Sequence, residues 1–196
     1  ERQLLALAAL TGERTWTSLL LELGGPGAAR ALEQLLSEHI LREQTQSRIP
    51  GEAQLRFQSE LLRHAVLRMV PFSDRPLRHL RIATWLETRA PFELSELIAK
   101  HFRSGASHDA ALPHYLAALD LAVRDAPESV PALISDVQEL RLQETQKLVA
   151  TLAAADAARA AKLPELAREL LQAAEALPIQ SPQERESAAV RLQRLR

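Results

Sequence analysis

The stretch FQSELLRHAVLRMVPFSDRPLRHLRIATWLE, residues 57–87, has the strongest helical periodicity in the chain and joins two unlike halves of the sequence. Its apolar residues recur at the spacing of an α-helix, which predicts two amphipathic helices. The first is expected to begin after Ser59, a good N-cap, and to end before Pro71, because proline disfavours helical geometry in the residue that precedes it. The expected apolar face of this helix is Leu61, Leu62, Ala65, Val66 and Met69.

The second helix of this stretch is expected over residues 73–89. Ser73 or Asp74 can serve as its N-cap, and Pro76 is tolerated in its first turn. Its apolar stripe is Leu77, Leu80, Ile82, Ala83, Trp85 and Leu86. The two helices together hold the densest positive cluster of the sequence: Arg63, His64, Arg68, Arg75, Arg78, His79 and Arg81. This cluster is either a docking face for an acidic surface or nucleotide phosphates, or the solvated flank of two packed helices.

The residues before this stretch predict a small domain of helices and one β-hairpin. The helices are expected over 1–11, 14–23 and 28–38, and the extended segments over 39–44 and 53–58. In the second extended segment Ala53, Leu55 and Phe57 fall on one face and polar residues on the other, which is typical of a strand. Three helices followed by a hairpin is the plan of a winged helix, so residues 1–71 are expected to form a winged-helix-like domain.

From residue 72 onward the sequence predicts helices alone, so the expected fold class is mainly α. These helices are expected over 73–89, 92–104, 107–124, 130–155, 163–177 and 183–196. The helices 92–104 and 107–124 are typical of an antiparallel hairpin of tetratricopeptide-like (TPR-like) type, with Gly105 ending the first as its C′ residue. We expect residues 72–196 to be a TPR-like repeat region that is truncated at its C-terminal end. Because the first residue is Glu, we expect the chain to be a piece of a longer protein.

Composition excludes several classes of function. Hydrophobic residues make up 46% of the 196 residues, which is ordinary for a globular protein. The formal net charge of -1 gives no global electrostatic reason to expect a nucleic acid or an acidic membrane as partner. The chain has no cysteine, which excludes disulfides, thiol catalysis and cysteine-ligated zinc. No apolar run is long enough to span a bilayer and no signal peptide is visible, so we expect a cytoplasmic protein with no membrane partner.

No residues in the sequence have the spacing of a known catalytic or metal site. The phosphate-binding pattern GxxxxGK[ST] is absent, and the glycine-rich segment 24–27 lacks the lysine and hydroxyl that such a loop requires. His101 and His114 are too far apart to form a metal-binding pair on one helix. We therefore expect no catalytic residue, no metal and no cofactor in this chain.

Residues 1–125 carry a pattern that is similar to one protein family. The first matching positions are Phe57, Leu61 and Leu62, then Arg75, His79, Ile82, Ala83, Leu86 and Glu87. The later ones are Leu97, Ile98, Ala99, His101, Phe102, Ser104 and Gly105, then Ala111, Leu112, Tyr115, Ala118 and Ala122. This pattern resembles the winged-helix and TPR-like region of bacterial multidomain signalling ATPases of the STAND class. One position departs from it, because Ser59 stands where the family usually has a histidine.

The resemblance implies a non-enzymatic regulatory module within a larger ATPase that binds ATP or ADP elsewhere and carries a kinase, nucleotide cyclase or transcription-regulator domain. In such proteins the winged helix packs on the protein's own nucleotide-binding domain, and the helical repeats sense a signalling partner or ligand. The residues expected at the domain junction are Phe57, Leu61, Leu62, His79, Ile82 and Leu86. The residues expected on a partner surface are Arg75, Arg78 and Arg81, with a groove formed by His101 and Tyr115. The oligomeric state stays open.

An alternative function is DNA binding by the winged helix of a transcriptional regulator. The recognition helix would be 28–38, whose one clear cation is Arg30, while Glu33 and Glu38 are expected to face outward. Acidic side chains on this helix would repel the DNA phosphates, so we favour a protein partner over DNA.

Overall fold

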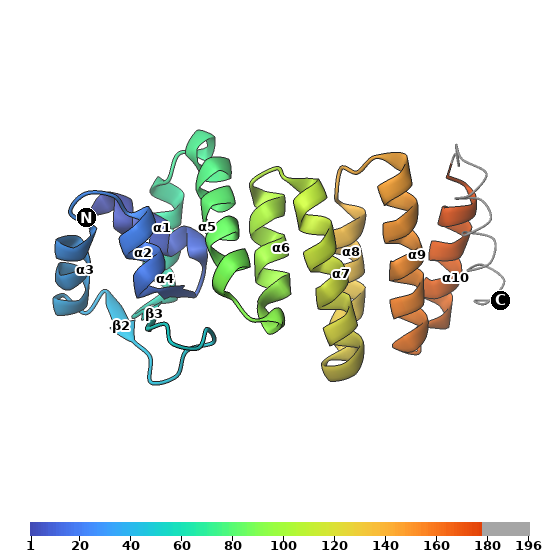
Figure 1. The fold of residues 1–196 in the computed structure, drawn as a ribbon, viewed down its shortest axis with the longest axis horizontal. Helices are drawn as coiled ribbons and strands as arrows, with labels where there is room; N and C mark the ends of the chain where they lie inside the picture. The colour runs from blue at the N-terminus through green and yellow to red at the C-terminus, as the bar shows by residue number, and fades with distance from the viewer. Residues whose placement is uncertain (178–196) are drawn as a thin grey trace. The chain divides into compact units, whose positions relative to one another are not determined.

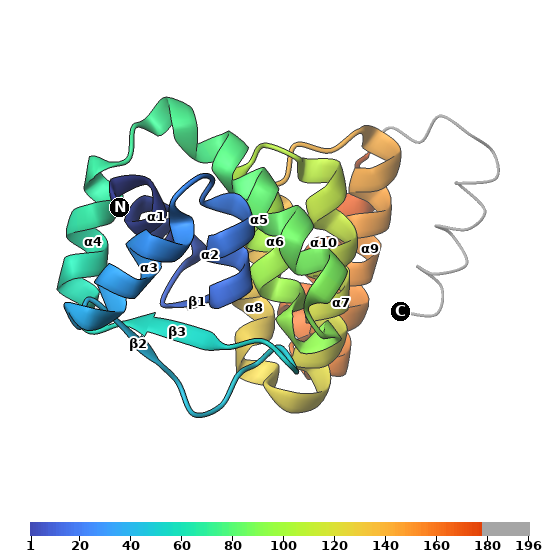
Figure 2. The same cartoon turned by 60° about the vertical axis from the view of Figure 1, so that its left-hand side comes forward.

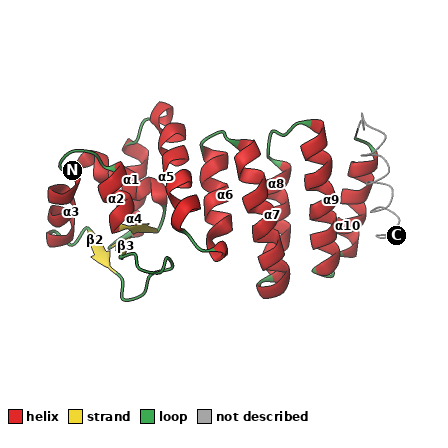
Figure 3. Ribbon diagram, viewed as in Figure 1, coloured by secondary structure: helices red, strands yellow, loops and turns green. Residues whose placement is uncertain are grey.

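The computed structural model describes residues 1–177, and the helix expected over 183–196 lies outside the described residues. The described chain is mainly helical, with ten α-helices and one small three-stranded sheet (Figure 1; Figure 3). It divides into two compact units. The first comprises residues 1–91 and 100–107, and the second comprises 92–99 and the described residues from 108 onward.

The first unit holds the helices and strands that precede residue 91. They are α1 (Arg2–Thr11), β1 (Arg14–Trp16), α2 (Thr17–Leu23), α3 (Ala28–Ser37), β2 (Leu41–Glu43), β3 (Gln54–Phe57), α4 (Glu60–Met69), the 3₁₀ turn η1 (Phe72–Asp74) and α5 (Arg75–Arg89). Helix α5 belongs to this unit because it packs against α1 and α2. The expected division after residue 71 places the boundary before α5 instead.

The sheet of the first unit is antiparallel in the order β1-β3-β2, and Figure 2 shows β2 and β3 below α3 and α4. The predicted hairpin of β2 and β3 is confirmed, with Leu41 paired with Phe57. The helix expected from residue 14 is wrong at its start, because Arg14–Trp16 is a strand whose Trp16 pairs with Gln54. A strand of three residues is too short to show an alternating pattern of its own.

The burial of one residue of β3 differs from the expected one. Gln54 is buried, whereas Ala53, expected on the inner face, is exposed. The amide oxygen of Gln54 accepts a hydrogen bond from the backbone N–H of Arg48 at 3.0 Å, which gives this buried oxygen a partner. The hydrogen bond therefore accounts for a buried polar side chain on the face that the alternation assigned to polar residues.

The core of the first unit joins α5 to the sheet through two tryptophans. The rings of Trp16 and Trp85 stack with centroids 6.2 Å apart, and both side chains are buried. Ile82 and Leu86 are also fully buried on this side of α5. With Ala83, four of the six apolar residues expected on α5 therefore form core packing, which positions the outer face of the helix.

The second unit is an array of helices. It contains η2 (Phe92–Leu94), the first part of α6 (Ser95–Ser104), α7 (His108–Asp125), η3 (Pro127–Ser129), α8 (Val130–Gln138), α9 (Glu144–Ala160) and α10 (Pro164–Glu175). Helix α7 packs on α8 and α9, and α9 packs on α10 (Figure 1; Figure 2). The helix expected over 163–177 is thus confirmed as α10.

The single helix expected over 130–155 is wrong, because the chain forms α8 and α9 with a break between Gln138 and Glu144. Leu140 is buried within this break and its N–H bonds to the carbonyl of Val137 at 3.1 Å. The break contains neither proline nor glycine, the residues that most clearly mark the end of a helix in a sequence.

The end of α6 differs from its expected geometry. Ala106, rather than Gly105, has the positive φ of a C′ residue, at 59°. The N–H of Ser107 bonds to the carbonyl of Phe102 at 2.9 Å and the N–H of Ala106 to that of Arg103 at 2.9 Å, which is a Schellman ending. Gly105 has a different role, because a Cβ there would lie 2.6 Å from Cγ of Leu80.

We predict opposite effects for two neighbouring substitutions at this helix end. Gly105→Ala should lower the free energy of unfolding by about 1–3 kcal/mol, because the added methyl overlaps Leu80 and, at 3.1 Å, its backbone nitrogen. Ala106→Gly should raise it by about 0.5 kcal/mol, because glycine adopts a positive φ without steric cost. Urea unfolding of both variants measures the two effects. If both substitutions destabilised equally, the assignment of Ala106 as the C′ residue would be wrong.

Candidate interaction surface and a buried histidine pair

Helix α4 has the boundaries that local chemistry predicts. The Ser59 hydroxyl accepts a hydrogen bond from the N–H of Leu62 at 3.4 Å, and Val70, before Pro71, is extended. Glu60 lies in the first turn and Arg68 in the last, where each charge complements the helix dipole. The N-cap and the proline therefore fix this helix as the sequence predicts.

Most of the expected apolar face of α4 is exposed to solvent. Only Val66 of this helix is buried, while Leu61 is 80% exposed and Met69 is 73% exposed. Leu62 and Ala65 are exposed as well. We call these four solvent-facing residues, Leu61, Leu62, Ala65 and Met69, the α4 face.

Polar contacts hold α4 by its other side. Helix α4 packs on α1 and β3, and the guanidinium of Arg63 reaches α1, where it donates to the carbonyl of Ala9 at 3.3 Å. Arg63 also forms an ion pair with Glu60 at 2.8 Å. Because Arg63 reaches α1, the opposite side of the helix, which includes Leu61, faces solvent.

The turn after α4 continues the exposed apolar surface. Phe72 in η1 is 81% exposed, and the guanidinium of Arg75 lies over its ring, 4.0 Å from the centroid. Arg75 also donates to the carbonyl of Val70 at 3.1 Å and to that of Leu67 at 2.8 Å. These bonds satisfy carbonyls at the C-terminal end of α4, so Arg75 mainly joins α4 to α5 instead of presenting a free cation.

The other two arginines of the expected partner surface are arranged differently. Arg78 and Arg81 lie one turn apart on α5 and line a hollow with residues of α1 and α2. Within residues 1–177, neither guanidinium has a hydrogen bond or an ion pair. These two arginines are therefore free to meet a group from outside the chain.

The expected junction residue His79 is paired with His101. Their Nδ1 atoms lie 2.9 Å apart, and Nε2 of His101 lies 3.2 Å from the carbonyl oxygen of Thr11. A carbonyl oxygen only accepts, so Nε2 of His101 carries the hydrogen and its Nδ1 is an acceptor. His79 must then donate from its own Nδ1, which fixes one tautomer for each ring. The chain His79–His101–Thr11 ties α5 and the end of α6 to α1.

This geometry keeps the histidine pair neutral. Burial, together with the nearby His79, lowers the pKa of His101 to about 3, although the bond to the Thr11 carbonyl acts in the opposite direction. Burial and then the charge of Arg75 lower the pKa of His79. Protonating His101 would place a hydrogen on both Nδ1 atoms and break the bond between the rings. The pair is therefore a structural contact at neutral pH.

Two residues expected on a partner surface are not on a surface. His101 is buried in the first unit and Tyr115 is fully buried in the second, where it faces into the packing of α7. The expected groove formed by these two side chains is therefore wrong. Their apolar neighbours at helical spacing give them the burial pattern of core residues.

The remaining junction residues divide into two groups. Phe57, Ile82 and Leu86 are buried inside the first unit, whereas Leu61 and Leu62 lie on the α4 face. The sequence alone did not separate these groups, since all five are apolar and recur at regular spacing.

The expected recognition helix, α3, keeps its acidic outer side in the structure. Arg30, Glu33 and Glu38 are all exposed, and Gln34 donates from its side chain to the carboxylate of Glu38 at 2.8 Å. The outer surface of α3 thus carries one cation beside two carboxylates, which is unfavourable for a phosphate backbone.

No protein-family model, no curated protein and no solved structure matches this chain. Within the described residues, no group of three or more His, Cys, Asp or Glu side chains is placed to hold a metal ion. No described helix has both the length and the apolar character needed to cross a membrane.

We predict that the histidine pair makes stability depend on pH. The folded pKa of His101 lies below its ordinary value of 6.5, so acid favours the unfolded state, which takes up the proton. The contribution of the neutral His101 to the free energy of unfolding is complete above pH 6.5. It is lost as pH falls toward about 3, by about 1.4 kcal/mol per pH unit.

Urea unfolding at pH 7.0, 6.0 and 5.0 measures this loss against that of a variant, His101→Gln, whose amide can replace both hydrogen bonds. The exposed His64 provides a matched control as His64→Gln. Of the three proteins, we expect only His101→Gln to show a shallower pH dependence of the free energy of unfolding. Identical slopes in all three proteins would show that His101 does not resist protonation.

Proposed function

We propose that this chain is a non-enzymatic, cytoplasmic regulatory and protein-interaction module of a larger STAND-type signalling ATPase. A winged-helix domain over residues 1–71 would couple the ATPase to a TPR-like region over residues 72–196. The order helix, strand, helix, helix, strand, strand in the first unit, with β3 between β1 and β2, supports the winged-helix assignment. The packing of consecutive helices from α7 to α10 supports a repeat-like array.

The observation that carries this proposal is the exposed α4 face. Soluble monomers rarely leave large apolar side chains clustered in contact with water, and such patches commonly mark binding sites. Covering one leucine or methionine side chain contributes about 1.5–3 kcal/mol to association. Leu61 and Met69, two helical turns apart on the same side of α4, therefore provide a natural anchor for a partner protein.

The partner we propose is the nucleotide-binding domain of the parent ATPase. A domain that covers the α4 face in one nucleotide state and leaves it in another would act as a switch. Arg68 is exposed and lies about two turns from Leu61 on the same side of α4. Its charge would favour an acidic rim on that domain. ATP or ADP would bind to the partner domain and not to this chain.

Direct DNA binding by α3 and the wing is the second candidate function. The observation in its favour is that β2 and β3 and the loop between them carry Arg42, Arg48 and Arg56, all exposed. Arg56 lies 3.9 Å from Glu13, which offsets part of this charge. An electrophoretic mobility shift at low salt tests it, and tight binding that weakens steeply with salt would favour DNA over a protein partner.

We predict that the double variant Leu61→Ser, Met69→Ser loses the partner without losing the fold. Both side chains are mostly exposed, so the melting temperature should change by no more than about 2 °C. Affinity for the parent's nucleotide-binding domain, measured by calorimetry in ADP and in ATP, should fall at least about tenfold in the state that binds.

The matched control is Val149→Ser, which alters an exposed apolar residue of α9 in the second unit. It should leave the affinity unchanged. Equal affinity of the α4-face variant and the unaltered chain would remove this face as the docking site.

A further inference from the structure

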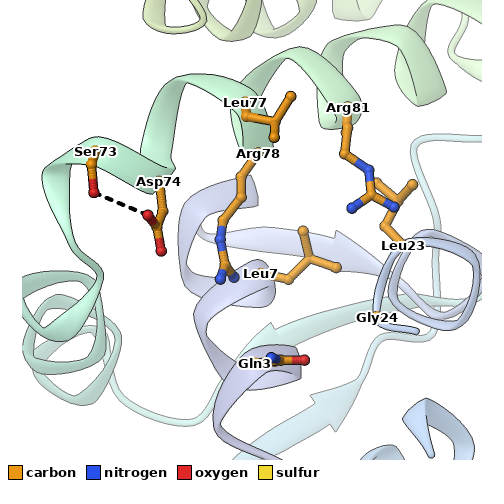
Figure 4. Close-up of a pocket in the computed structure, with 9 residues that line it drawn as sticks. All are labelled: Gln3, Leu7, Leu23, Gly24, Ser73, Asp74, Leu77, Arg78 and Arg81. Atoms are coloured by element: carbon orange, nitrogen blue, oxygen red, sulfur yellow. Dashed lines mark hydrogen bonds between the residues drawn. The ribbon is translucent and has the colours of Figure 1, made fainter. Parts of the chain in front are cut away.

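A hollow in the first unit has the features of a small-molecule site. It has a volume of about 390 Å³ and is bordered by α1, the end of α2, η1 and α5 (Figure 4). Its lining residues are Gln3, Leu7, Leu23, Gly24, Ser73, Asp74, Leu77, Arg78 and Arg81. This volume falls within the range of pockets that hold small organic ligands.

Two cations dominate the charge of this hollow. Figure 4 shows the side chains of Arg78 and Arg81 extending from α5 toward α1 and the end of α2 (Figure 4). Neither forms an ion pair or a hydrogen bond with any residue from 1 to 177. The only acid of the lining is Asp74, which accepts a hydrogen bond from Ser73 at 3.0 Å. Two positive charges against one negative charge leave the hollow suited to an anion.

The rest of the lining is suited to an apolar body. Leu7 lies near the guanidinium of Arg78 and Leu23 near that of Arg81, while Leu77 belongs to α5 itself (Figure 4). Gly24 adds no side chain that would fill the space, and a Cβ there would lie 2.4 Å from Cδ1 of Leu4. The wall of the hollow at Gly24 is therefore held in close contact with α1.

We propose that this hollow binds a small organic anion, with an oxyanion head held by Arg78 and Arg81 and a short apolar chain lying on Leu7, Leu23 and Leu77. Guanidinium groups match the geometry of carboxylate and phosphate oxygens and bind them through paired hydrogen bonds. This site is separate from the α4 face, since its residues come from α1, α2, η1 and α5, and it adds a ligand to the protein partner proposed above.

The ligand head can be a carboxylate or a phosphate monoester, and the test distinguishes them. Hexanoate and hexyl phosphate are titrated into the ¹⁵N- and methyl-labelled chain and followed by the Arg Nε–H and Leu methyl signals. Hexanol supplies the apolar chain without charge, and inorganic phosphate supplies charge without the chain. We expect saturable shifts with a Kd of about 1 mM or tighter for at least one of the two amphiphilic anions, and weaker binding of hexanol and phosphate.

The variant Arg78→Gln, Arg81→Gln should weaken binding at least about tenfold, because both charge-assisted contacts are lost. Arg159→Gln removes an exposed arginine of α9 that does not line the hollow and should leave the Kd unchanged. An unchanged amide spectrum away from the hollow shows that each variant folds.

Absence of saturable shifts with both anions would overturn the proposal, as would equal binding by the double arginine variant. Tighter binding of hexanoate would assign a carboxylate ligand, and tighter binding of hexyl phosphate would assign a phosphate ester. A negative result in this test would leave the proposed docking role of the α4 face unaffected, because the two proposals rest on different residues.

Discussion

The way in which two arginines hold α4 determines what the first unit presents to solvent. Arg63 donates to the carbonyl of Ala9 on α1, and Arg75 donates to carbonyls at the C-terminal end of α4. Together these bonds fix the rotation of the helix and the angle at which α5 leaves it. The apolar side chains Leu61 and Met69 consequently point outward, although the helix is amphipathic and a core lies beneath it. The inner side of α4 is thus held by polar contacts together with the buried Val66, and Leu61 and Met69 stay exposed.

The contact between α5 and the rest of the unit follows from the same arrangement. Trp85 stacks on Trp16, and His79 bonds to His101, which bonds in turn to Thr11. These contacts bury one side of α5 and leave the neighbouring side to line the hollow with its two arginines. One helix therefore supplies both core packing and a charged site, and the two features occupy different sides of it.

The sequence predicts what depends on local chemistry and misses what depends on tertiary contacts. The ends of α4 were predictable because Ser59 caps and Pro71 terminates within the helix's own sequence. Its rotation was not, since Val66 and Met69 are equally apolar and only the position of α1 decides which is covered. The break before α9 lacks proline and glycine, and the His79–His101 contact joins residues 22 positions apart, so neither leaves a periodic signal. The sequence shows a glycine at position 105, but the need for it comes from the close approach of Leu80, which is a tertiary contact.

The α4 face is open in this chain, and we propose that it is covered in the parent protein. Met69 lies on that face and is the single methionine of the sequence, so its oxidation by peroxide is read directly from the intact mass. The measurement compares its oxidation rate in the isolated chain with that in complex with the parent's nucleotide-binding domain. We expect a rate close to that of free methionine in the isolated chain, since Met69 is 73% exposed, and strong protection in the complex. Slow oxidation in the isolated chain, or equal rates with and without the domain, would contradict it.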